Sequence, residues 1–234
     1  MSLLERPELT GQNPAVKFLT WKSDEKRFEY YDKVLKTKVK QELPLKLFFV
    51  EHYHTVKGWH DATQKGIYSN EVYLSSKEEL DVKTFGGLKI AKGIFKDIKS
   101  QIESAGANYH RSIYCVNENF ELINVALKGS CIGGIKAEKS LNGLAIDGYS
   151  EFYSKNGRLL DNQWFEIISF SEGKSGKINY SIPTFIVSSH VIQEDFENIK
   201  SIANQLQNFV DKRSNSNINV IDAEIVDNEE PLDF

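Results

Sequence analysis

The sequence predicts a β-rich α+β protein on three observations. Short segments with alternating apolar and polar residues recur between residues 15 and 189, separated by polar turns. Two longer segments repeat apolar residues every three or four positions, which is typical of amphipathic helices. Hydrophobic residues make up 40% of the 234, enough for a substantial core, and no apolar run approaches the roughly 20 residues of a membrane span.

The N-terminal half is expected to hold most of one sheet. Alternation predicts strands over residues 15–21, 27–32, 36–43, 45–56 and 66–74, the first three as an antiparallel meander. After these strands the spacing of apolar residues changes from every second position to every third or fourth. Apolar residues at helical spacing predict a core-facing helix over 88–104 that ends near Gly106.

The C-terminal half returns to short strands and ends in a helix. Strands are expected over residues 109–116, 120–127, 145–154, 163–170 and 178–189, with a shorter helix near 130–141. From Ile192 to Phe209 the apolar residues again follow a helical spacing, which predicts an amphipathic helix of about five turns.

These elements divide the chain into an N-terminal arm (1–13), a β-rich body (14–212) and a tail (213–234). The tail has too little apolar surface to order itself, so it is expected to be flexible. Many short strands around one helix, with a basic, aromatic-rich first sheet, favour an elaborated OB-fold-like antiparallel barrel for the body. A β-sandwich of similar strand count produces almost the same pattern and stays open as an alternative.

Charge is distributed unevenly along the chain. The formal net charge is -4, but six acidic residues and no Lys or Arg follow Ser214, which leaves 29 basic against 27 acidic residues before it. Between Lys17 and Lys57 there are ten basic and six acidic residues. The body therefore carries a basic N-terminal half whose field the tail opposes.

Basic and aromatic residues are interleaved over 18–33 and again over 53–68. Single-stranded nucleic acid needs cations for its phosphates and flat rings on which unpaired bases stack. The expected nucleic-acid-binding residues are Lys17, Trp21, Lys22, Lys26, Arg27, Phe28, Tyr30, Tyr31, Lys38, Tyr53, Lys57, Trp59, Lys65 and Tyr68. For any single aromatic residue, a place in the core or in a cross-strand pair is the alternative.

The histidines of residues 51–61 raise the question of a metal. His52 and His54 share one strand face, with His60 nearby, and such a set resembles the donors of a catalytic zinc. No Glu follows at a suitable spacing and Lys57 would repel a cation, so hydrogen-bonded histidines, with no metal and no cofactor, are expected.

Signs of catalysis and of a disulfide framework are missing from the sequence. It contains no nucleophile elbow, Walker loop, dinucleotide-binding glycine pattern or paired-carboxylate signature, so a protein that is not an enzyme is predicted. Cys115 and Cys131 show no CxxC spacing and are expected to be reduced and structural.

The tail combines acidic residues with an apolar tip. A partner with a basic-rimmed apolar pocket would bind such a segment, and the tethered anion could also occupy the body's own cationic groove. The expected partner-binding residues are Asp227, Glu229, Glu230, Leu232, Asp233 and Phe234.

The layout resembles the single-stranded DNA-binding proteins of bacteria and their phages, several of which end in Phe as this sequence does. Residues 13–33 and 57–72 also look like uncharacterised proteins of large tailed phages. The resemblance implies an OB-fold protein of phage DNA replication and recombination that binds single-stranded DNA without strong sequence preference. It implies recruitment of replication and recombination proteins through the tail.

The expected location is the bacterial host cytoplasm, without a membrane partner, because acidic residues and Pro occupy the start where a signal peptide would be apolar. Self-association is left open. The alternatives are a phage interaction or scaffold protein without nucleic-acid affinity and a metalloprotein with histidine ligands.

Overall fold

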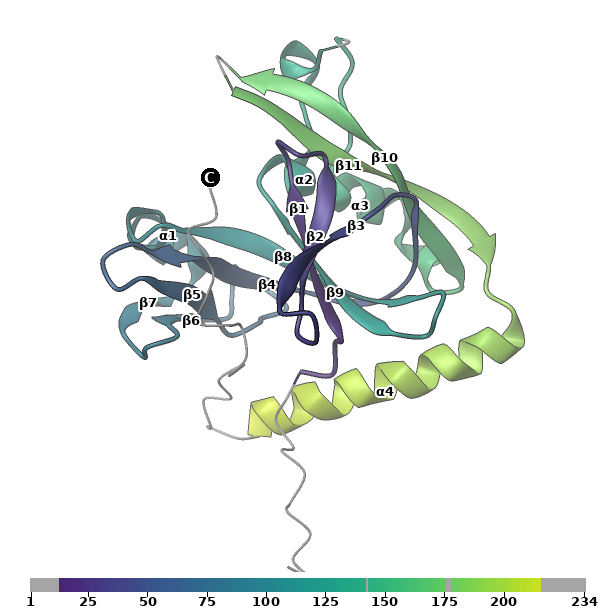
Figure 1. The fold of residues 1–234 in the computed structure, drawn as a ribbon, viewed down its shortest axis with the longest axis horizontal. Coiled ribbons are helices and arrows are strands. Elements are labelled where there is room, and N and C mark those ends of the chain that lie inside the picture. Colours follow the sequence, from purple (N-terminus) through teal and green to yellow (C-terminus); the bar gives the residue numbers. More distant parts are fainter. Residues whose placement is uncertain (1–12, 142, 176–177, 216–234) are drawn as a thin grey trace, which may run out of the picture.

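Eleven strands form one mixed, open sheet in the computed structural model, which describes residues 13–141, 143–175 and 178–215 (Figure 1). The strands are β1 (Lys17–Lys22), β2 (Arg27–Asp32), β3 (Thr37–Gln41), β4 (Leu45–His60), β5 (Lys65–Ser69), β6 (Leu80–Thr84), β7 (Lys89–Gly93), β8 (Ala107–Asn117), β9 (Leu122–Lys128), β10 (Gln163–Ser175) and β11 (Ile178–His190). The main path is β3-β2-β1-β9-β8-β4-β5-β6-β7. Its pairs are antiparallel except β1 with β9, which run parallel.

The 16-residue strand β4 connects the parts of the sheet. One edge pairs with β8 from Leu47 to Gly58. The other edge pairs with β10 at its beginning and with β5 at its end. A main body and a smaller lobe therefore share this strand (Figure 1).

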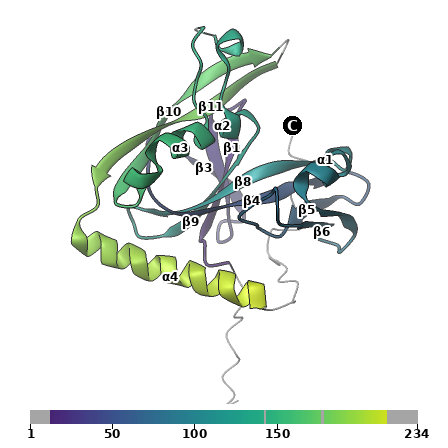
Figure 2. The ribbon, with the colours of Figure 1, turned by 180° about the vertical axis from the view of Figure 1, so that it is seen from behind.

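The inner face of the sheet, which carries Leu47, Ile113 and Val125, packs against α2 (Ser130–Gly133) and α3 (Tyr149–Leu160). Figure 2 shows both helices beside the β10–β11 hairpin. Trp21 of β1 donates its indole N–H to the carbonyl of Ser181 on β11 at 3.0 Å. The sheet therefore curls until β11 meets the end of β1, although the two strands share no backbone ladder.

The outer face, which carries Phe48, Tyr114 and Val116, packs against α4 (Gln193–Asn215). Ile199 and Leu206 of this helix are almost fully buried there. Their spacing of seven residues places them on one stripe of the helix, which explains the apolar period in the sequence. No described helix is both long enough and apolar enough to cross a membrane.

The smaller lobe consists of β5, β6 and β7 with α1 (Phe95–Ser104) packed on the inner face. Ile98 and Ile102 of α1 reach Val56 and Ala107 in one core cluster. Gly58 lies opposite Ala107, where an added Cβ would come within 2.3 Å of the Ala107 Cα atom. Only glycine permits the two strands to lie this close.

The strand-rich α+β class and most of the expected strands are confirmed, and four local predictions are corrected. The expected strand 145–154 is largely the helix α3, because Tyr149, Phe152 and Leu160 bury one helical face. The expected helix 88–104 is β7 followed by α1, and the last residue of β7 is Gly93 at φ 152°.

The expected strand 66–74 ends at Ser69, and β6 was not predicted. The helix expected near 130–141 is reduced to α2 and a 3-10 turn over Ala137–Lys139. Most of the arm, and the tail beyond residue 215, lie outside the described residues.

Candidate nucleic-acid interface

Beyond the cluster under α4, the outer face of the sheet becomes cationic. Lys128 of β9 pairs in register with His110 of β8, and Thr20 of β1 pairs with Ala126 of β9. Because side chains alternate along a strand, Lys22, Lys128 and His110 project from the same face. Lys57 of β4 follows one row further along this face, opposite Asn108.

The register places Lys57 and Lys128 near the neutral His110, and Lys22 near Lys128. His110 is 7% exposed, and burial, with repulsion from Lys57 and Lys128, lowers its pKa to about 3. Burial and repulsion from Lys22 also lower the pKa of Lys128. Concentrated positive charge on one face of the sheet is the electrostatic requirement of a phosphate-binding surface.

Aromatic rings continue the same face onto β5. Tyr68 pairs in register with Lys57, and its ring stacks on Phe85 with centroids 4.8 Å apart and an angle of 19°. Phe85 lies flat over Gly66, where an added Cβ would come within 2.6 Å of the ring. Trp59 pairs with Gly66 and shares the face. Cations and half-buried rings therefore adjoin, as base stacking requires.

At the other end of the sheet, β2 and β3 extend the face. Tyr31 pairs with Lys38, and Glu29 pairs with Lys40. Arg27 is bonded to Glu29 at 2.8 Å and also contacts Glu25, so its charge is largely compensated. Lys38 and Lys40 are exposed. We define the cationic face as Lys22, Tyr31, Lys38, Lys40, Lys57, Trp59, Tyr68, Phe85 and Lys128.

Three rings of the expected set belong to the cores, which corrects the sequence prediction for them. Trp21 and Phe28 pack edge to face at 4.8 Å in the inner cluster and are 5% and 0% exposed. Tyr53 lies in the cluster under α4 with 4% exposure. A base has no access to these rings.

Other expected residues lie away from the cationic face. Tyr30 packs against the inner core, with the Lys17 ammonium 5.7 Å from its ring centroid. Lys17 pairs with Glu121 at 2.7 Å. Lys26 forms an ion pair with Glu172 at the same distance. Lys65 projects from the face opposite to Tyr68, since the two differ by an odd number of positions in one strand.

The structure thus brings together Lys22, Tyr31, Lys38, Lys57, Trp59 and Tyr68 from the expected set. It adds Lys40, Phe85 and Lys128, which sequence reasoning missed. The sequence feature that could have indicated Lys128 is a lysine at the end of a strand whose other residues are buried. Its relevance depends on the pairing of β9 with β1, which the sequence did not reveal. The expected tail residues lie outside the described residues.

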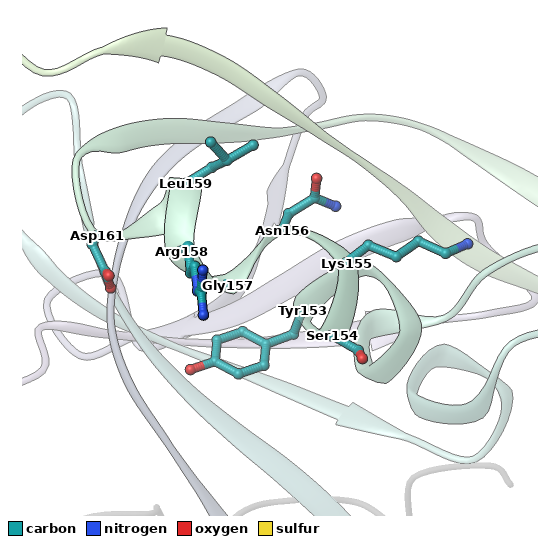
Figure 3. Close-up of a pocket in the computed structure, with 8 residues that line it drawn as sticks. All are labelled: Tyr153, Ser154, Lys155, Asn156, Gly157, Arg158, Leu159 and Asp161. Atoms are coloured by element: carbon teal, nitrogen blue, oxygen red, sulfur yellow. The ribbon is translucent and has the colours of Figure 1, made fainter.

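Metal-binding clusters and pockets are the other features that can mark a functional site. Among the described residues no group of three His, Cys, Asp or Glu side chains could hold a metal ion. An open depression of about 530 Å³ runs along α3, lined by Tyr153, Ser154, Lys155, Asn156, Gly157, Arg158, Leu159 and Asp161 (Figure 3). It contains none of the residues expected to bind nucleic acid.

No protein-family model, curated protein or solved structure matches this chain. The geometry of the cationic face is therefore the basis for a functional assignment.

Proposed function

We propose that the protein binds single-stranded DNA across the cationic face. The observation that supports this most directly is the group of lysines on the β1-β9-β8-β4 segment of the sheet, with Lys22 and Lys128 in one row and Lys57 in the next. Three strand spacings of about 4.8 Å spread these lysines over roughly 14 Å. A flexible polyanion laid across them would relieve the repulsion between Lys22 and Lys128.

The residue types indicate binding without strong sequence preference. Lysine ammonium groups act as point charges on phosphate, and Tyr68, Phe85 and Trp59 offer rings on which any base can stack. Sequence-specific readout would require positioned amide or guanidinium groups at base edges. The nearest arginine on this face, Arg27, is held by Glu25 and Glu29.

An OB-like barrel is the architecture we propose for the body. Its support is the path β1-β9-β8-β4-β10-β11 together with the contact between the last strand and the end of the first. A small barrel is defined by a sheet that curls until its first and last strands meet.

A role in phage DNA replication and recombination, with partners recruited by residues 227–234, remains part of the proposal. It rests on the acidic composition and apolar tip of that segment and on the resemblance described above. An acidic segment tethered to a cationic face also competes with DNA for it.

The test is a titration with fluorescent oligo(dT) over a salt series. Each phosphate contact contributes a slope of about -0.7 to log K against log salt, so three lysines account for a slope of roughly -2. The triple variant K22Q/K57Q/K128Q should lose most of this slope and at least tenfold in affinity. The matched control K96Q/K155Q/K200Q removes the same charge from exposed helix positions.

Binding that is insensitive to salt, or an equal loss in both triple variants, would contradict the proposal. Failure of the wild-type protein to bind oligo(dT) at low salt would favour the alternative of an interaction or scaffold protein.

A further inference from the structure

A second polar cluster lies on the inner face of the sheet, opposite to the cationic face. His54 of β4 pairs in register with Arg111 of β8, and His52 precedes it on the same face of β4. The main core ends at Ile113 on one side of these residues, and the lobe core begins at Val56 on the other. The cluster therefore fills the boundary between the two cores.

The hydrogen bonds define the tautomer of His54 and the orientation of His52. Arg111 Nη1 donates to His54 Nε2 at 2.7 Å. Because that nitrogen accepts, His54 Nδ1 carries the ring proton and donates to the Tyr109 hydroxyl. His52 Nδ1 lies 2.9 Å from the hydroxyl of Tyr149 on α3. Both histidines are thus held in fixed orientations.

Aromatic rings enclose the cluster from both lobes. The His52 ring lies 4.6 Å from the ring of Tyr153 on α3 and 5.7 Å from that of Phe49. On the other side, Tyr109 packs against Phe95 of α1 at 4.7 Å. Figure 1 and Figure 2 place α1 and α3 on either side of this stretch of β4 and β8.

Arg111 brings a positive charge into this enclosure without a matching anion. No carboxylate forms an ion pair with it in the part of the chain that the structure describes, and its Nε atom is buried without a hydrogen-bond partner. Glu51, the residue before His52, is bonded to the backbone instead. Its Oε1 atom accepts the backbone N–H of His52 at 2.8 Å, and burial raises its pKa. Arg111 is half-buried, and a solvent-excluded Nε donor without a partner indicates a missing acceptor.

We infer that Arg111, His54 and His52 form a binding site for a phosphate-type oxyanion, separate from the proposed DNA interface. The planar guanidinium matches the geometry of two phosphate oxygens, and it has further N–H donors besides the one that His54 accepts. The Tyr109 hydroxyl accepts from His54 and so keeps its own proton for a remaining oxygen, and the Tyr149 hydroxyl can do the same when His52 Nδ1 carries the ring proton. A metal cation is disfavoured by the same guanidinium.

The pKa values of the two histidines should change when an oxyanion occupies the site. Burial and, next, the charge of Arg111 lower the pKa of both His52 and His54 to about 4. The other titratable groups facing them are Glu51, Tyr109, Tyr149 and Tyr153. A bound dianion offsets the repulsion from Arg111, so phosphate should raise both pKa values while chloride at equal ionic strength should not.

The experiment uses the full chain with inorganic phosphate and with adenosine 5′-monophosphate as probes. Thermal melts in phosphate, chloride and acetate at equal ionic strength and pH 7 measure stabilisation, and NMR titration of the histidine ring protons measures the pKa shifts. Stabilisation should grow with the logarithm of phosphate concentration. The variant R111Q should lose it, whereas R158Q, the same change at an exposed position of α3, should retain it.

Two further variants keep the test decisive. If R111Q fails to fold, R111K replaces it in the test. R111K preserves the charge but not the fork, so it should bind phosphate at least tenfold more weakly than the wild type. The triple variant K22Q/K57Q/K128Q should keep the full phosphate effect, so the two proposals can fail independently. Equal stabilisation of R111Q and the wild type, equal effects of acetate and phosphate, or loss of the effect in the triple variant would overturn the site.

Discussion

Ser23, just after β1, and Ser181 of β11 are joined by three hydrogen bonds although 158 residues separate them. The Ser23 hydroxyl donates to the Ser181 carbonyl at 3.0 Å and accepts the Ser181 backbone N–H at 2.7 Å, and the Ser181 hydroxyl donates to the Ser23 carbonyl at 2.6 Å. This contact is where the curled sheet meets itself.

Removing the Ser23 hydroxyl should therefore destabilise the body. In Ser23→Ala the backbone N–H of the buried Ser181 loses its acceptor, which costs about 1–3 kcal/mol. Urea unfolding followed by tryptophan fluorescence measures the difference. Ser154→Ala on the exposed side of α3 is the matched control and should change the free energy of unfolding by less than about 0.5 kcal/mol. A null effect of Ser23→Ala would show that the contact does not hold the sheet closed.

Substitution of Tyr68 should weaken DNA binding while leaving the fold intact. Its half-buried ring stacks on Phe85 at the surface, so Tyr68→Ala should reduce oligo(dT) affinity by about 1–3 kcal/mol. Trp21→Ala should instead destabilise the protein by about 3–5 kcal/mol, because the ring fills the core. Titrations paired with thermal melts separate the two results, and similar binding losses at equal folded fraction would contradict the assignment of Trp21.

Stability should fall as the pH decreases below about 6.5. His110 is neutral in the folded protein down to its pKa of about 3, whereas in the unfolded chain it binds a proton near its usual pKa of 6.5. The unfolded state therefore binds more protons between these values, and stability is lost as the pH falls through this window. One such proton changes the free energy of unfolding by up to about 1.4 kcal/mol per pH unit.

Replacing the histidine tests this assignment. His110→Gln should make the dependence of unfolding free energy on pH less steep between about 6 and 4 by the contribution of one proton, while His52 and His54, whose pKa is also lowered, keep their share of the slope. Denaturant titration at each pH measures the change. His190→Gln, at an exposed position at the end of β11, should leave the slope as in the wild type. Identical slopes in all three proteins would mean that His110 is not held neutral.

Removal of residues 216–234 should tighten DNA binding at low salt. The deletion removes six acidic residues and changes the formal net charge from -4 to +2. The gain should shrink as the Debye length falls toward about 8 Å at physiological ionic strength. A full-length variant with those six residues changed to Asn or Gln should reproduce the gain if charge is the cause. Unaltered low-salt affinity in both variants would exclude competition by this segment.

Local patterns determined much of the secondary structure. Alternation placed most strands within a few residues, and the helical spacing of Ile192, Phe196 and Ile199 predicted α4 and its apolar face. The same alternation failed at 145–154. The apolar residues there fit both periods, and only packing of Tyr149 and Phe152 on the inner core selects the helix.

The candidate sites depended on tertiary structure. Alternation indicates that Trp21 and Lys22 point to opposite faces, but which face is covered depends on where α3 and α4 pack. The parallel pairing of β1 with β9 brings Lys22 beside Lys128 across more than a hundred residues, and the pairing of β4 with β8 places His54 beside Arg111. Sequence periodicity determines local backbone geometry and the alternation of side chains. Strand neighbours and buried faces are decided by long-range packing, which no local pattern encodes.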